Sequence, residues 1–175
     1  MSMTALRRNT WWVLPELLAL AVVAALSPLL RPVDLDAALA ARVTQVLELS
    51  TPAEHHDHGH EVKADDRVIC TAETMGYEPV DARTVAEVRR VYAYYLCAAG
   101  SPGQPWDFAS RISGPVAVDL TEPPVVRIAQ AGQGYPDRVR ALLPDRYEAR
   151  AFNGFVNHDL PKRVLERYED EVADA

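Results

Sequence analysis

A predominantly apolar run of twenty residues near the start of the chain constrains its fold more than any other feature. Residues 11–30 read WWVLPELLALAVVAALSPLL and contain one charged side chain, Glu16. At about 1.5 Å per residue, a helix of this length matches the ~30 Å hydrocarbon thickness of a bilayer. A buried helix without a polar face would need a larger protein around it than 175 residues supply. The run therefore predicts a transmembrane helix.

The residues before the run suggest its topology. Trp11 and Trp12 stand where interfacial aromatic side chains concentrate, and Arg7 and Arg8 precede them. We therefore expect residues 1–10 to be a cytoplasmic tail, followed by a signal anchor that crosses the cell membrane once. The lipid bilayer is then a partner, and the rest of the chain is extracytoplasmic. The alternative is a secreted protein, because arginines followed by an apolar run also begin a cleaved signal peptide.

Residues 31–52 predict a juxtamembrane amphipathic helix that ends at Thr51-Pro52. Its apolar side chains recur at helical spacing, at Leu35, Leu39, Val43, Val46 and Leu47. Such a helix could be a stalk that pairs with another copy or lies along the membrane surface, or it could dock on the chain's own domain. We prefer docking, because two heptads are too short to indicate a coiled coil.

The next segment marks the expected domain boundary. Residues 53–65, AEHHDHGHEVKAD, are almost wholly polar and predict a histidine-rich linker. We therefore expect an extracytoplasmic domain over residues 66–175, and the 49% of apolar residues in the chain is enough for a core. A net charge of −7 without a clustered basic face excludes nucleic acid as a partner.

Patterning within residues 66–175 predicts an α+β fold. The clearest helix is expected over residues 84–100, because Thr84 and Glu87 have the spacing of a capping box and apolar residues follow at helical intervals. Further predicted elements are strands at 66–70 and 146–152, a hairpin of 114–120 with 124–130, and helices at 137–143 and from Asp159. Without regular βαβ alternation, we expect an antiparallel sheet with two to three packed helices.

The chain contains two cysteines, so only one pairing is available. They are Cys70 and Cys97. Outside the cytoplasm a disulfide is the expected state, and it would stabilise the fold by roughly 3 kcal/mol. The alternative is a pair of buried thiols, since cysteine packs as a small apolar residue. A catalytic thiol is disfavoured, because no neighbouring residue in the sequence supplies a base.

Four of the five histidines lie within the segment EHHDHGHE. Imidazole binds zinc, copper and nickel, and short histidine-rich tracts are typical of metal binding. The candidate ligands are His55, His56, His58 and His60, with Asp57 and His158 as further candidates. Ordering a linker costs roughly 1–2 kcal/mol per residue, so the segment alone would bind weakly. A plain solvated linker and a segment that charges between about pH 7 and 5 are the other interpretations.

Motifs with a known chemistry are missing from the sequence. Neither a Walker loop, H-E-x-x-H nor G-x-S-x-G occurs. Ser110, Ser113 and His158 could be arranged into a hydrolytic triad, but so could any three polar residues, so their presence does not indicate one. The arginine-, alanine- and proline-rich composition is typical of a high-GC bacterial genome. We expect a non-catalytic binding or assembly role at the bacterial cell envelope, with another membrane or envelope protein as partner. A zinc, copper or nickel protein is the second hypothesis, and a hydrolase is the third.

Overall fold

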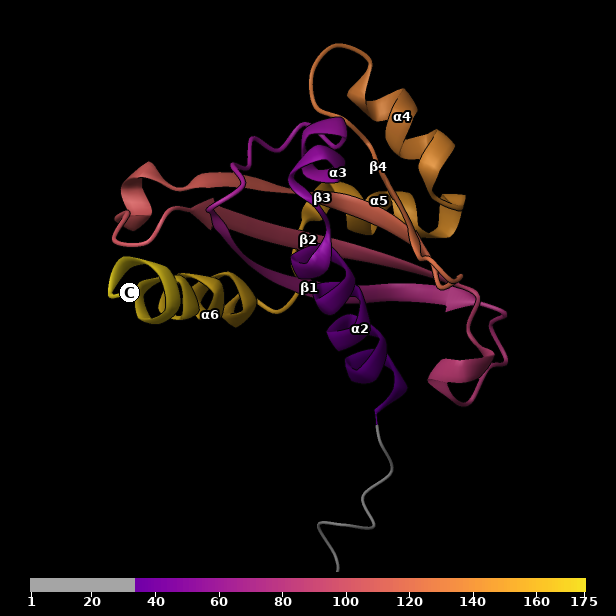
Figure 1. Cartoon of the computed structure of the whole chain (residues 1–175). Helices are drawn as coiled ribbons and strands as arrows, with labels where there is room; N and C mark the ends of the chain where they lie inside the picture. The colour runs from indigo at the N-terminus through magenta and orange to yellow at the C-terminus, as the bar shows by residue number, and fades with distance from the viewer. Residues whose placement is uncertain (1–33) are drawn as a thin grey trace, which may run out of the picture. The chain divides into compact units, whose positions relative to one another are not determined.

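The computed structural model describes residues 34–175, so the predicted tail and membrane anchor, with Arg7, Arg8, Trp11 and Trp12, lie outside the described residues. Within residues 34–175, no helix has the length and apolar character needed to cross a membrane. These residues form one compact unit (Figure 1). The domain boundary expected at residue 66 therefore lies inside a unit that begins at Asp34.

A four-stranded antiparallel sheet organises this unit. Its strands are β1 (Arg67–Glu78), β2 (Arg90–Gly100), β3 (Ser110–Asp119) and β4 (Val125–Ile128). Each strand pairs with the next one in the sequence, which leaves β1 and β4 at the two edges. The predicted α+β class is confirmed, as is the hairpin, which is the β3–β4 pair.

Helices cover both faces of the sheet. Helix α2 (Leu35–Leu49) packs on one face and buries Leu39, Val43, Val46 and Leu47 there. The opposite face is covered by α4 (Tyr135–Leu142), α5 (Asp145–Asn153) and α6 (Asp159–Tyr168), which continues into a π-helical turn, η4 (Glu169–Ala173). Figure 1 shows α2 in front of the strands and α5 behind them. The predicted amphipathic helix thus docks on its own domain.

The helix predicted over residues 84–100 is wrong. These residues form a short 3-10 turn, η2 (Val85–Glu87), followed by β2. Because both faces of the sheet are covered, β2 carries apolar residues without the alternation of a half-exposed strand, and its pattern resembles that of a buried helix. Tyr92 and Tyr95, which a helix would place on one side, belong to the cores on opposite faces of the sheet.

The remaining elements show which local signals were reliable. The strand predicted at 146–152 is wrong, because these residues lie in α5; acidic Asp145 and Glu148 in its first turn favour a helix there. The predicted helices at 137–143 and from Asp159 are confirmed as α4 and α6. The loop between β2 and β3 contains a second 3-10 turn, η3 (Trp106–Phe108).

The predicted disulfide between Cys70 and Cys97 is confirmed. It joins directly opposed residues of β1 and β2, whose Cα atoms are 4.1 Å apart. So short a separation is typical of a non-hydrogen-bonded pair, in which the backbone groups of each residue point away from the other strand. Accordingly, the Cys70 N–H donates to Glu48 Oε1 at 2.8 Å, and its carbonyl accepts from Arg167 at 3.2 Å.

Candidate functional site

The histidine-rich segment is not a linker, because it begins as a capped helix, α3 (Pro52–Asp57). The Thr51 hydroxyl accepts from the Glu54 N–H at 3.3 Å, and the Glu54 carboxylate accepts from the Thr51 N–H at 2.6 Å. This capping box, with proline at the first helical position, fixes the start of the helix. Its hydrogen bonds also lower the pKa of Glu54. The pattern T-P-x-E was present in the sequence and could have predicted this helix.

Helix α3 and the following turn bring His55 and His60 together inside the protein. Their side chains are 3% and 2% exposed, and their Nδ1 atoms are 3.4 Å apart. His60 Nε2 lies 3.0 Å from the Ser110 carbonyl, so we assign a proton to that nitrogen. His60 Nδ1 is then an acceptor, and His55 Nδ1 donates to it. His55 Nε2 is left buried without a hydrogen-bond partner among the described residues.

Burial keeps three of these imidazoles uncharged at neutral pH. It lowers the pKa of His55 to about 4, helped by the nearby His60 and His58 and opposed by the backbone of Leu47. Burial also lowers the pKa of His60 and of His58, and in His58 an interaction with the backbone of Val126 opposes this shift. Within the segment that was read from its composition as polar, His55 and His60 are therefore buried, uncharged packing residues.

The candidate metal ligands do not converge on one point. His56 is exposed and lies 3.4 Å from the Glu61 carboxylate, while the Asp57 carbonyl accepts from the Gln130 side chain. His158 is exposed and stands immediately before α6, which covers the opposite face of the sheet from α2. Across residues 34–175, no group of three or more His, Cys, Asp or Glu side chains is arranged to hold a metal ion.

The residues of the hydrolytic hypothesis are not assembled either. Ser110 and Ser113 are three residues apart in β3, so their side chains point to opposite faces of the sheet. His158 lies before α6, and the one histidine that reaches this strand is His60, which meets the Ser110 backbone rather than its hydroxyl. Ser110, Ser113 and His158 therefore do not form a triad.

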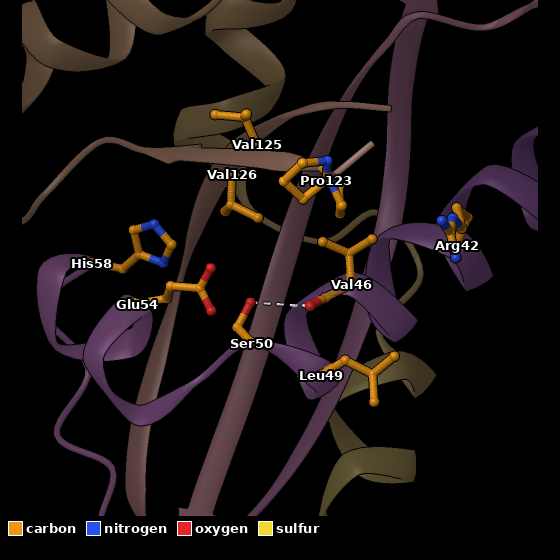
Figure 2. Close-up of a pocket in the computed structure, with 10 residues that line it drawn as sticks. Arg42, Val46, Leu49, Ser50, Glu54, His58, Pro123, Val125 and Val126 are labelled. Carbon is orange, nitrogen blue, oxygen red and sulfur yellow. Dashed lines mark hydrogen bonds between the residues drawn. The ribbon is translucent and has the colours of Figure 1, made fainter. Parts of the chain in front are cut away.

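An open groove of about 550 Å³ lies between the end of α2, α3 and the start of β4 (Figure 2). Its apolar lining consists of Val46, Leu49, Pro123, Pro124, Val125 and Val126, and its polar lining of Arg42, Ser50, Glu54 and His58. The Leu49 side chain is 74% exposed and that of Val125 is 43% exposed. Figure 2 shows Glu54 and His58 on the α3 side, facing Val126 of β4.

The groove also contains part of the edge of β4, where His58 interacts with the backbone of Val126. The Leu120 N–H donates to the Arg89 carbonyl at 2.8 Å, which places this pair and Val91–Val118 among the hydrogen-bonded pairs of the β2–β3 ladder. Val118 therefore directs its backbone groups towards β2. Because Val126 is opposite Val118 on the other side, the N–H and carbonyl of Val126 point out of the sheet, towards the groove.

This arrangement suits binding better than a reaction. Exposed aliphatic side chains form an apolar surface, and Arg42 and Glu54 place opposite charges in the lining. A partner segment could bury its own apolar side chains there and be oriented by the two charges. The sequence did not indicate this site, because its residues come from positions 42–58 and 123–126 and no local pattern connects them.

Comparisons with known proteins do not assign the chain to a family. No protein-family model, no curated protein and no solved structure matches it. The function is therefore inferred from the chemistry of residues 34–175 and from the sequence that precedes them.

Proposed function

We propose that this protein is a membrane-anchored, non-catalytic binding or assembly module of the bacterial cell envelope, with residues 34–175 outside the cytoplasm. The apolar run at 11–30 supports the anchor, since its length matches a bilayer. The disulfide between Cys70 and Cys97 supports the extracytoplasmic side, because such bonds persist in oxidising compartments. The partner is an apolar segment of another membrane or envelope protein.

The groove beside β4 is the observation that carries the binding role. Leu49 and Val125 expose large apolar side chains within one concave surface, at a strand edge whose Val126 backbone groups face outwards. Apolar side chains that gather in this way mark interaction sites, whereas isolated exposed ones need no explanation. The opposite charges of Arg42 and Glu54 would favour one orientation of the bound segment.

Photo-crosslinking in intact cells tests the groove. A photoreactive side chain at Leu49 should capture one defined membrane or envelope protein. The same group at Val80, which is 68% exposed but lies outside this groove, should not. Leu49→Asp should abolish co-purification of that protein from solubilised membranes, and Val80→Asp should leave it unchanged. Equal capture from both positions would rule out the groove as the binding site.

Fractionation tests the anchor separately. The full chain should remain in the membrane pellet after a carbonate wash, and a chain that begins at Asp34 should appear in the supernatant. Mass spectrometry of the mature N-terminus distinguishes the two topologies, because a signal anchor keeps residues 1–30 and a cleaved signal peptide loses them. Release of the intact full chain by carbonate would contradict the proposed membrane span.

A transition-metal role is the second candidate, and one observation favours it. The Nδ1 atoms of His55 and His60 are 3.4 Å apart, close to the roughly 3.3–3.4 Å between two ligands of a tetrahedral zinc ion. A hydrogen bond explains the same distance, and no third ligand is in place within residues 34–175, so we rank this role second. In calorimetric zinc titrations, binding that His55→Ala abolishes and His56→Ala preserves would support it. Equal binding by both variants would remove it.

A further inference from the structure

The face of the sheet that carries α2 is covered less completely than the opposite face. A helix is about 10 Å wide and neighbouring strands are ~4.8 Å apart, so one helix covers two strands of a sheet. Helix α2 lies over β1 and β2. The opposite face is covered by α4, α5 and α6. Within residues 34–175, β3 and β4 therefore have no long helix over them on the α2 side.

The short helix α3 covers only the later part of β4. The ring of His58 interacts with the backbone of Val126, and the Asp57 carbonyl accepts from the side chain of Gln130, which follows the strand. The residues that lead into β4, Pro123 and Pro124, line the groove instead. The groove beside β4 thus lies where the helical cover of this face is incomplete.

The wall that α2 contributes to this groove has the spacing of a helix contact. Arg42, Val46 and Leu49 stand four and three residues apart, so they lie on one side of α2. They span about 10 Å along its axis, which is also the length of two turns of a second helix. Rows of side chains at this spacing form the ridges that pack against a neighbouring helix.

The charges at the ends of the groove match those of a helix. Figure 2 shows Arg42 at one end and Glu54 with His58 at the other. The cap hydrogen bonds lower the pKa of Glu54, so this carboxylate is ionised at neutral pH. The Arg42 guanidinium donates to the Gln45 side chain at 2.8 Å and has no carboxylate partner within residues 34–175. A helix carries partial positive charge at its N-terminus and negative charge at its C-terminus.

We propose, on the basis of the binding role proposed above, that the segment held beside β4 is an amphipathic helix of the partner protein, antiparallel to α2. Its N-terminus then lies near Glu54 and its C-terminus near Arg42. Its apolar face covers Leu49, whose side chain is 74% exposed. A strand fits less well, because His58 already interacts with the backbone of Val126 at this edge. The partner helix is expected to carry apolar residues at i, i+3 or i+4 and i+7.

A second copy of this chain does not offer such a helix. Within residues 34–175, α2, α4, α5 and α6 each bury their apolar side against their own sheet. The apolar run at residues 11–30 is assigned to the bilayer in the proposed function. The helix therefore belongs to a different protein.

Photo-crosslinking in intact cells, with the captured residues mapped by mass spectrometry, tests the helix. Photoreactive side chains are placed one at a time at Arg42 and at Leu49 of the full chain. These positions are about 10 Å apart along α2, so the captured partner residues should be about seven apart in a helix and about three apart in an extended segment. The residue captured from Arg42 should be the later one in the partner sequence. An extended spacing or the reverse order overturns the proposal.

Ala41 is the matched control for this experiment. It is exposed on α2 but lines the groove on the other side of the helix, so it should capture no residue of this partner. If neither Arg42 nor Leu49 captures a protein, the proposed binding role fails, and the helix with it. Capture at an extended spacing leaves the binding role intact and removes only the helix.

A synthetic peptide of the mapped partner segment tests its conformation. Binding is measured by fluorescence anisotropy with the full chain in nanodiscs, against protein-free nanodiscs. Proline at the centre of the peptide breaks a helix and should weaken binding at least about tenfold, whereas proline at the first residue should change it less than about threefold. Equal effects of the two prolines overturn the proposal.

Charge variants test the direction of the helix with the same peptide. Arg42→Glu should weaken binding at least about threefold, because it places a negative charge at the negative end of the bound helix. Arg42→Lys keeps the charge and should retain binding. Arg83→Glu, at an exposed position outside this groove, should leave binding unchanged. Equal binding by Arg42→Glu and Arg83→Glu overturns the antiparallel arrangement.

Discussion

The five histidines of this chain have environments that their sequence positions do not reveal. His55 and His56 are adjacent, yet the first is 3% exposed and the second lies on the surface. The capping box at Thr51 and Glu54 could have predicted that this segment is helical. The burial of His60 in this segment could not have been predicted, because its Nε2 atom meets the carbonyl of Ser110, which is fifty residues further along the chain.

The buried His55 predicts a pH-dependent stability. Its pKa is about 4 in the folded protein, against an ordinary value of 6.5, so between these values the unfolded chain binds the extra proton. Above pH 6.5 His55 is neutral in both states and does not lower the free energy of unfolding. As the pH falls towards 4, its burial lowers the free energy of unfolding by up to about 3 kcal/mol.

Urea unfolding at a series of pH values measures this effect. The free energy of unfolding should decrease steadily as the solution is acidified through this range, and His55→Gln should flatten the decrease. His56→Ala, at the exposed neighbouring position, should keep the decrease of the unmodified protein. A stability that does not change across this range would contradict the assigned environment of His55.

Gly100 is a second residue whose environment predicts an effect. A Cβ atom at this position would overlap the hydroxyl of Tyr168, whose side chain is fully buried and has no room to move. Gly100→Ala should therefore destabilise the fold by about 1–3 kcal/mol in thermal unfolding. Gly114→Ala is the matched control in β3, because its Cβ would lie 3.7 Å from the nearest atom, in ordinary contact. Similar losses in both variants would contradict this explanation.

At the scale of elements, the sequence predicted the helices α2 and α6 and the β3–β4 pair. The apolar stripe of α2 faces the sheet as expected, and α6 and the β3–β4 pair follow their patterns. Strand β2 was mistaken for a helix because it is buried on both faces, so its sequence lacks the two-residue period. The helices that bury its second face, α4, α5, α6 and η4, come later in the chain, so the local pattern does not reveal them.

Side-chain contacts satisfy the backbone groups of Cys70 at the edge of β1. Glu48 accepts from the Cys70 N–H and pairs with Arg167 at 2.9 Å. Glu48→Ala removes both interactions, so hydrogen exchange of the Cys70 amide should become at least about tenfold faster. Glu166→Ala, an exposed carboxylate on α6, is the control and should leave this amide unchanged. Equal exchange in the two variants would show that Glu48 does not protect the edge.

At the scale of the whole molecule, residues 34–175 are three layers, with α2 and α3 on one side of the sheet and α4, α5 and α6 on the other (Figure 1). Composition and patterning were sufficient for the α+β class and for the disulfide. They were not sufficient for the groove beside β4, because it forms between residues 42–58 and 123–126, which are distant in the sequence and meet only in the folded chain.

The disulfide predicts a global effect. Cys70 and Cys97 are 27 residues apart, and closing a loop of this length restricts the unfolded chain by about 3–4 kcal/mol in the chain-entropy account. The double variant Cys70→Ala/Cys97→Ala should lose that much stability in chemical unfolding. The unmodified protein, recovered from its native membrane, should show no free thiol. Two free thiols there would contradict both the bond and the proposed extracytoplasmic location.

The covered faces of the sheet and the bond across its first two strands also have a mechanical consequence. The outer strands β1 and β4 are three spacings apart, about 14 Å at ~4.8 Å per spacing. The sheet between them is held by backbone ladders and, between β1 and β2, by the Cys70–Cys97 bond. Tension applied by a partner in the groove beside β4 would therefore be transmitted across the sheet to β1 as through a rigid body.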